Sequence, residues 1–479
     1  MSKFKPSHSS AVRPRPAKRP AGTQVYAVQD RQTGGLIEEN GERVDGLPPS
    51  VELPPNAVQR MGFIAVALFI FFRFSFAHEF VAAKLNINTH VIILLGAASY
   101  LFCILSGQMA KAFRERTTFL WCGFLACMSI ATVTSFWKGG SFPLWVDYLE
   151  TVFPVVFVLP ALTTTRSQLI KMLSTIGVAC IAMVALGMFN HDLLSGRMNI
   201  DAAGSDIQDP NDYAAHLILM LPALAFLTLR AGRPVLLKLI GLAAFAFSFR
   251  QILSTGSRGG LLSLAITALY IAVIGSNKVR LAILVGGPIL GLLAVPFIPS
   301  ESAARLSLLF SSPVTANNAE AAESQDARLA LLKASGKATL QHPLFGVGPG
   351  IFMDYQAITA GESGQRGMWH VTHNSYTQIS SECGIPAAIL YIGALGSTFL
   401  MLRAAGKSKD RELATVALFI SVMMVGFCAC MCFLSLAYSV HILAMSALAV
   451  ALKQRLQADG NFPDLLSAGQ FANAEALPA

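Results

Sequence analysis

Long apolar segments separated by short polar connections make up most of the chain after about residue 58. Segments of about 20 apolar residues have the length of an α-helix that crosses a lipid bilayer. We therefore predict an all-α polytopic membrane protein with about twelve transmembrane helices. The expected helix starts lie near positions 59, 89, 117, 145, 169, 213, 234, 259, 280, 378, 413 and 434.

One long polar stretch, residues 299–375, interrupts this pattern and is predicted to form a large loop. The first residues are rich in Pro, Ser, Lys and Arg and lack apolar periodicity, which is typical of a disordered segment. The expected organisation is a disordered basic tail over 1–57, nine helices over 58–298, the loop over 299–375, three helices over 376–453 and a second tail over 454–479.

Composition and charge support this class and indicate an orientation. Hydrophobic residues make up 54% of the chain and charged residues only 13%, which argues against a water-soluble enzyme. Most of the 36 Lys and Arg residues fall on the side of the predicted helices that carries both tails. Because basic residues flanking transmembrane helices stay in the cytoplasm, we predict cytoplasmic termini and an extracytoplasmic loop. The net charge of +9 is thus a topology signal, and it requires no nucleic-acid partner.

The first chemical candidate is the segment Thr255–Gly260, which opens the eighth predicted helix from the extracytoplasmic side. A helix N-terminus offers free backbone N–H groups, glycines allow a close approach, and the guanidinium of Arg258 donates in a fork that suits phosphate. This combination predicts an anion site. The structural alternative is a Gly-rich turn whose arginine reaches lipid headgroups.

The second candidate is His373, which precedes the tenth predicted helix. Ser375 and Gln378 have the spacing of a capping box, which places His373 just before the helix N-terminus. An imidazole there is suited to act as a general base, although a structural surface histidine is the alternative. Neighbouring candidates for substrate contact are Asn374, Tyr376 and Glu382.

The third candidate is Arg328, within a stretch of helical periodicity from Ala319 to Gln341 inside the loop. It offers a second phosphate contact, or it forms an ordinary surface pair with nearby residues of its own helix. The Gly-rich run 342–350 that follows lacks the Gly-Lys-Ser/Thr ending of a phosphate-binding P-loop, and we interpret it as scaffold.

Two further features involve polar residues next to apolar segments. Asp209 and Asn211 flank Pro210 at the start of the sixth predicted helix, where Asp as N-cap and Pro at the first helical position explain the pattern, with substrate binding as the alternative. Arg73 lies inside the first apolar segment, where a cation is usually paired or functional, so substrate binding and pairing with Asp147, Glu150 or a lipid phosphate are the alternatives. The histidines lack accompanying Cys or carboxylate residues at ligand spacing, so we predict no metal site.

These candidates share the extracytoplasmic side, where cytoplasmic nucleotide sugars are absent. A sugar donor used there has to arrive through the membrane on a lipid. A diphosphate on a long lipid would suit Arg258 and Arg328, and His373 would remove the proton of an acceptor hydroxyl. The sequence therefore favours glycan transfer from a polyprenyl diphosphate carrier.

The same residues resemble the bacterial O-antigen ligase/polymerase family over about residues 200–400. The resemblance rests on Asp209-Pro210-Asn211, Ser257-Arg258-Gly259-Gly260, Arg328, the run 342–350, and His373-Asn374 followed by Gly384. The family often has Gly, Thr or Tyr three residues after that glycine, whereas this chain has Ala387.

The resemblance implies a GT-C-like glycosyltransferase of the bacterial inner membrane that uses neither metal nor cofactor and inverts the sugar. In it, Arg258 and Arg328 would bind the diphosphate of a polyprenyl-linked oligosaccharide and His373 would act as base. The acceptor would be a glycan or a lipid A core, which leaves polymerase and ligase both open, and other polysaccharide-assembly proteins are expected partners. The competing function is a transporter or lipid-glycan flippase without chemistry, although the candidates gather on one side of the membrane and not near its midplane.

Overall fold

The computed structural model describes residues 28–29, 36–37, 55–87, 90–189, 191–194, 196–200, 207, 209–307, 319–362, 367 and 369–463. The chain divides into two units, Met1–Glu52 and Leu53–Ala479. In the first, the described part is an antiparallel pair of the short strands β1 (Val28–Gln29) and β2 (Leu36–Ile37). The prediction of a disordered N-terminal tail otherwise concerns residues outside those described, as does most of the second tail.

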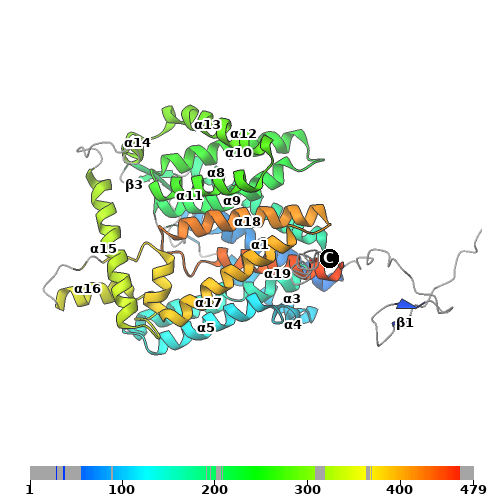
Figure 1. Cartoon of the computed structure of the whole chain (residues 1–479), viewed down its shortest axis with the longest axis horizontal. Helices are drawn as coiled ribbons and strands as arrows, with labels where there is room; N and C mark the ends of the chain where they lie inside the picture. Colours follow the sequence, from blue (N-terminus) through cyan, green and yellow to red (C-terminus); the bar gives the residue numbers. More distant parts are fainter. Residues whose placement is uncertain are drawn as a thin grey trace, which may run out of the picture. The chain divides into compact units, whose positions relative to one another are not determined.

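The second unit is built from helices, in agreement with the predicted all-α class (Figure 1). Its first half contains α1 (Ala57–Ser75), α2 (Ala77–Leu85), α3 (Val91–Ser106), α4 (Met109–Ala112), α5 (Arg116–Val133), α6 (Lys138–Asp147), η1 (Tyr148–Val152), α7 (Val155–Leu162), α8 (Arg166–Phe189) and α9 (Pro210–Leu229). A hairpin of β3 (His191–Leu194) and β4 (Arg197–Ile200) connects α8 to α9.

The second half contains α10 (Val235–Ser254), α11 (Arg258–Ile274), α12 (Asn277–Leu281), η2 (Ala282–Gly286), α13 (Gly287–Ala294), η3 (Val295–Phe297), α14 (Ser300–Ser307), α15 (Ala319–Gln341), α16 (Phe352–Glu362), α17 (Ser375–Ala405), α18 (Arg411–Met431) and α19 (Val440–Ala458). The helix expected from Ala319 to Gln341 is therefore present with those bounds as α15.

Nine helical segments among the described residues are long and apolar enough to cross a membrane, and α3 and α11 are shorter apolar helices. Most of the expected starts fall within a few residues of these helices. The last one, expected near 434, begins only at Val440, because Ser439 caps α19 by accepting a hydrogen bond from the His441 N–H. The residues before it form a loop that belongs to the candidate site. The count of twelve stays a prediction.

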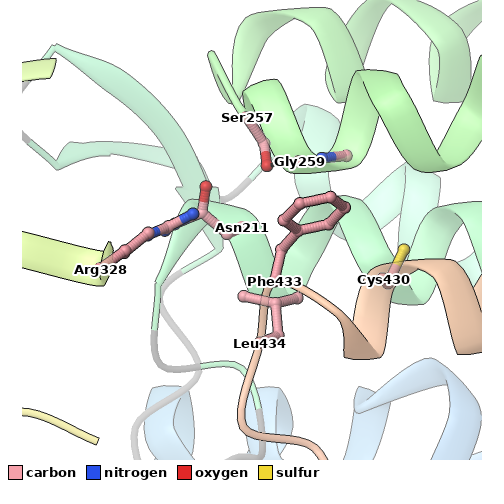
Figure 2. Close-up of a pocket in the computed structure, with 8 residues that line it drawn as sticks. Asn211, Ser257, Gly259, Arg328, Cys430, Phe433 and Leu434 are labelled. Carbon is pink, nitrogen blue, oxygen red and sulfur yellow. Dashed lines mark hydrogen bonds between the residues drawn. The ribbon is translucent and has the colours of Figure 1, made fainter. Parts of the chain in front are cut away.

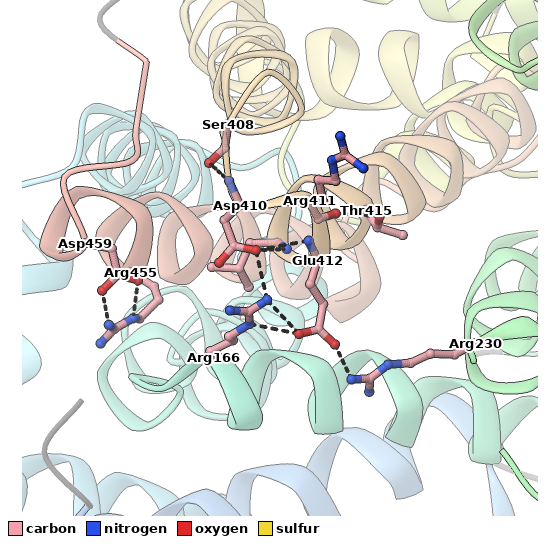
Figure 3. Close-up of polar contacts among 10 residues, drawn as sticks. Arg166, Arg230, Ser408, Asp410, Arg411, Glu412, Thr415, Arg455 and Asp459 are labelled. Atoms are coloured by element: carbon pink, nitrogen blue, oxygen red, sulfur yellow. Dashed lines mark hydrogen bonds and ion pairs between the residues drawn. The ribbon is translucent and has the colours of Figure 1, made fainter. Parts of the chain in front are cut away.

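Ion pairs gather at one end of these helices (Figure 3). Arg166, at the start of α8, donates to Asp410 at 3.0 Å and to Glu412 at 2.8 Å, and Arg230, at the end of α9, also pairs with Glu412. Asp410 caps α18 by accepting the N–H groups of Glu412 and Leu413. This is the end that the distribution of Lys and Arg predicts to be cytoplasmic.

The centre of the unit is occupied by α9 and α19, most of whose side chains are buried. Two buried histidines interrupt this apolar packing. The rings of His216 and His441 meet edge to face at 4.6 Å, and Phe74 lies 4.5 Å from His441. Arg73 precedes Phe74 in the last turn of α1, so it belongs to the neighbourhood of this cluster.

The Gly-rich run 342–350 is held against a kink in α17. Gly384 interrupts the helix with a φ of 87°, a left-handed conformation that favours glycine. The kink leaves the carbonyls of Ser381 and Glu382 to accept the N–H groups of Val347 and Gly348, both at 2.9 Å. This run thus anchors the end of α15 to α17, which agrees with its interpretation as scaffold.

Candidate active site

His373 lies in the turn that leads into α17. Its φ of 50° is left-handed, which is uncommon outside glycine, and its backbone N–H donates to the Ser435 hydroxyl at 2.9 Å. Thr372 shares the same hydroxyl, at 3.0 Å between the two side-chain oxygens. Neither imidazole nitrogen of His373 has a hydrogen-bond partner among the described residues. The backbone of His373 is therefore fixed while its imidazole remains available to a ligand.

The capping box predicted for α17 is wrong, although the helix starts where expected. Asn374 is the N-cap, and its side-chain oxygen accepts the N–H groups of Tyr376 and Thr377, both at 3.0 Å. The Ser375 hydroxyl instead donates to the Leu434 carbonyl at 2.7 Å and accepts the Leu436 N–H at 2.8 Å. The Ser375 hydroxyl, which the spacing predicts to cap the helix, is thus bound to the segment between α18 and α19 instead.

The other candidates on α17 also have partners within the protein. Asn374 Nδ2 donates to the Cys432 carbonyl and the Tyr376 hydroxyl to the Cys428 carbonyl, each at 3.0 Å. The buried Glu382 carboxylate accepts the Gly350 N–H at 2.9 Å and the Tyr438 hydroxyl at 2.7 Å. These contacts hold α17 to the end of α18 and to the Gly-rich run. Substrate contact by these residues stays a prediction.

Arg258 is the first residue of α11, as predicted. Ser257 caps the helix by accepting the Gly260 N–H at 3.1 Å, and Gly256 takes a left-handed φ of 60° before it. The Arg258 guanidinium donates to the side-chain oxygen of Gln325 on α15 at 3.1 Å. The helix N-terminus, the glycines and the arginine therefore come together, and α15 lies within reach of them.

Asp209 is the N-cap of α9, with Pro210 at the first helical position, as the sequence pattern predicts. Its carboxylate accepts the N–H groups of Asn211 and Asp212 at 2.6 and 3.1 Å. The side-chain oxygen of Asn211 accepts a hydrogen bond of 2.9 Å from Arg197, whose Nε also donates to the Thr255 carbonyl at 2.7 Å. Arg197 thus ties β4 to the N-terminus of α9 and to the turn before α11.

A small pocket lies where these elements meet (Figure 2). Arg328 reaches toward it from α15, and its guanidinium lies near Asn211 in the view. Phe433 and Leu434, from the segment between α18 and α19, form the opposite wall. The lining residues are Asn211, Ser257, Gly259, Gly260, Arg328, Cys430, Phe433 and Leu434. Arg328 is therefore directed at Asn211 in the first turn of α9, and it is not confined to a surface pair within its own helix.

Burial and the neighbouring charges together set the protonation state of His373. The pKa of its imidazole is lowered from 6.5 to about 4, first by burial and next by the positive charge of Arg328, with Asp209 opposing. Burial also lowers the pKa of the Arg328 guanidinium, while Asp209 raises it. A guanidinium nevertheless stays protonated in proteins. At pH 7 the site therefore holds a neutral imidazole, able to accept a proton, beside a fixed cation.

Arg73 is not among the charged residues that act on His373. It lies in α1 next to Phe74 and the His216–His441 pair, and it does not line the pocket. In the described part of the chain, no group of three or more His, Cys, Asp or Glu side chains has the arrangement to hold a metal ion.

Comparison with known families assigns the region that carries this site. Residues 242–392 match the family model described as O-antigen ligase. This part of the chain is thus similar to O-antigen ligases. The match confirms the resemblance drawn from the motifs and indicates a membrane enzyme of polysaccharide assembly. Among curated proteins, none matches the chain.

The matched region does not supply the whole site. It contains Arg258, Arg328 and His373, whereas Asp209, which caps α9, precedes residue 242. Two contributors that sequence reasoning missed also lie outside it, Arg197 before and Ser435 after. The sequence gives little indication of a role for Arg197, because a single arginine between two helices is typical of a solvent-exposed loop residue. Ser435 gave no signal, because its segment was expected to start a helix.

Proposed function

We propose that this protein transfers a glycan from a polyprenyl-diphosphate-linked donor to a hydroxyl of an acceptor sugar at the extracytoplasmic face of the bacterial inner membrane. The observation that carries the proposal is the convergence of three side chains from three elements. The charge of Arg328 from α15 acts both on Arg258 of α11 and on His373 before α17, at the end of the helices opposite the ion pairs of Figure 3.

The proposed reaction uses each group for one task. The two guanidinium groups hold the donor diphosphate by forked, charge-assisted hydrogen bonds, which also stabilise the charge of the leaving group. The neutral His373 imidazole takes the proton of the acceptor hydroxyl. The acceptor oxygen then bonds to the anomeric carbon as the bond from that carbon to the diphosphate oxygen breaks, and the electron pair leaves with the polyprenyl diphosphate. In-line attack inverts the anomeric carbon, and no metal is required.

Polymerase and ligase differ in the acceptor and not in this chemistry. A polymerase would use another lipid-linked glycan, and a ligase would use a lipid A core. Both accord with the same pocket, so the proposal covers the two together.

The direct test is transfer by the purified full chain in lipid nanodiscs, with a polyprenyl-diphosphate-linked oligosaccharide and a candidate acceptor. Glycan size and release of polyprenyl diphosphate are followed for wild type, His373→Ala, Arg258→Lys and His370→Ala. His370 is the matched control, because it is an exposed histidine whose ring lies 6.4 Å from that of His373. We expect loss of about 10² to 10⁴ in rate for His373→Ala and little change for His370→Ala.

Arg258→Lys should also impair transfer, because an ammonium group cannot make the forked contact. Full transfer by His373→Ala would overturn the base role. If wild type moved intact lipid-linked glycan across the bilayer without releasing diphosphate, the protein would be a transporter and the proposed reaction would be wrong.

A further inference from the structure

The short helix α14 is fixed against the turn that precedes Arg258. The buried Ser302 hydroxyl donates to the Ser254 carbonyl at the end of α10, with a distance of 2.6 Å. One turn further, Leu306 packs in an apolar cluster with Leu253 and Ala294. These two anchors, one polar and one apolar, set the position of α14 and of Arg305 between them.

Glycine at position 256 permits this close approach. Its φ is 60°, and a Cβ at this position would lie 3.1 Å from the Ser302 Cα. The turn that caps α11 and the helix that carries Arg305 are therefore packed backbone against backbone. The fold therefore places the helix that carries Arg305 against the turn that precedes Arg258.

Arg305 belongs to the same electrostatic group as the two donor-binding arginines. Its positive charge contributes to the lowered pKa of Arg258. It also helps to lower the pKa of Arg328, where burial is the larger cause and Asp209 acts in the opposite direction. Three guanidinium groups repel one another here, Asp209 and Asp212 offset part of this repulsion at Arg328, and burial of the site reduces the screening of the charges. An anion bound among them would be attracted by all three guanidinium groups. The more phosphate groups it carries, the more of the three cations it can engage.

We propose that Arg305 is a third donor-binding residue, which contacts the lipid diphosphate and makes the site selective for a diphosphate over a monophosphate. The inference rests on the proposed function, because it assigns a further residue to the same donor site. A guanidinium fork matches one phosphate group, so a site with three such forks suits two linked phosphates better than one. Arg305 is thus a binding residue and takes no part in proton transfer.

The test measures binding and therefore does not depend on turnover. Farnesyl diphosphate and farnesyl monophosphate serve as probes, titrated against the purified full chain in detergent. Arg305→Gln should weaken binding of the diphosphate about tenfold or more, the effect of losing one charge-assisted contact, and weaken the monophosphate less than about twofold. Lys333→Gln is the matched control, because it removes an exposed cation from α15, and it should leave both affinities unchanged.

Each outcome bears on a separate claim. Equal weakening of the two probes, or no change, would overturn the role of Arg305 while leaving the donor site intact. If wild type bound neither probe, the proposed function would fail together with this inference. Gel filtration checks that the variant is folded. If Arg305→Gln does not fold, Arg305→Lys is used, which keeps the charge but not the fork and should still reduce the preference for the diphosphate.

Discussion

The hydroxyl of Ser435 accepts the backbone N–H of His373 at 2.9 Å and thereby fixes a histidine that has left-handed backbone geometry. The two residues come from different parts of the chain, since Ser435 lies between α18 and α19 and His373 precedes α17. Their contact links the position of the proposed base to the loop that forms one wall of the pocket.

Ser435→Ala should therefore lower the rate of transfer by about tenfold, because small misplacement of a reacting group is costly. It should also lower stability by about 1 kcal/mol through the lost hydrogen bond. The measurement is kcat of glycan transfer together with thermal unfolding in detergent.

Ser408→Ala provides the matched control, because the Ser408 hydroxyl accepts the Asp410 N–H at 3.2 Å at the opposite end of the helices. It should lower stability by a similar amount and leave kcat unchanged. A parallel loss of kcat in both variants would mean that the effect of Ser435 is one of stability alone.

The low pKa of His373 predicts a pH profile for transfer. A general base acts in its neutral form, so kcat/KM should be constant at neutral pH and fall as pH decreases through about 4 in wild type. The positive charge of Arg328 is one cause of this low pKa. Arg328→Gln removes that charge, which favours the protonated imidazole and raises its pKa. The acid limb of the profile should therefore move to higher pH, on top of weaker donor binding.

The comparison requires that the protein stay folded at each pH, which gel filtration after incubation shows. Lys333→Gln removes an exposed charge from the same helix and should leave the acid limb in place. An unchanged limb in Arg328→Gln would mean that the titrating group is not His373.

Local sequence rules identified the individual candidates because each has a local signature. Arg258 follows the N-cap Ser257 at a Gly-rich helix start, and Asp209 is the N-cap before Pro210. In both places the local pattern marks the start of a helix. The apolar segments predict most helix starts closely, since a helix in lipid has to satisfy its backbone internally and bury a continuous apolar length.

The remaining features depend on packing between distant segments. Asn374 and Ser375 are both suitable N-caps, and the choice is made by Leu434 and Leu436, which engage the Ser375 hydroxyl. Arg305 gains its place only because α14 packs on the end of α10. Such contacts have no periodicity or spacing in the sequence, so single-sequence reasoning could not find them.

Glu412 bridges Arg166 and Arg230 at the end of the helices away from the site (Figure 3). Glu412→Gln should lower stability by about 1 kcal/mol at most, because the three side chains are 31% to 43% exposed and solvent screens their attraction. Transfer per folded molecule should be unchanged. Thermal unfolding and kcat are measured for this variant and for Arg411→Gln, a control at the exposed neighbouring position. A large fall in kcat with unchanged unfolding would show coupling between the two ends of the helices.

The kink of α17 predicts opposite effects of one substitution at two glycines of the same helix. A Cβ at Gly384 would lie 2.3 Å from the Leu344 carbonyl oxygen, and the φ of 87° is unfavourable for any other residue. Gly384→Ala should therefore destabilise the protein by about 2 kcal/mol or more and displace the Gly-rich run from Ser381 and Glu382. A Cβ at Gly396 meets nothing within 4 Å, so Gly396→Ala should be neutral or stabilise the helix by about 0.5 to 1 kcal/mol. Thermal unfolding separates the two, and protease sensitivity of residues 342–350 reports on the docked run. Equal stability of the two variants would mean that the run 342–350 is not held by the kink at Gly384.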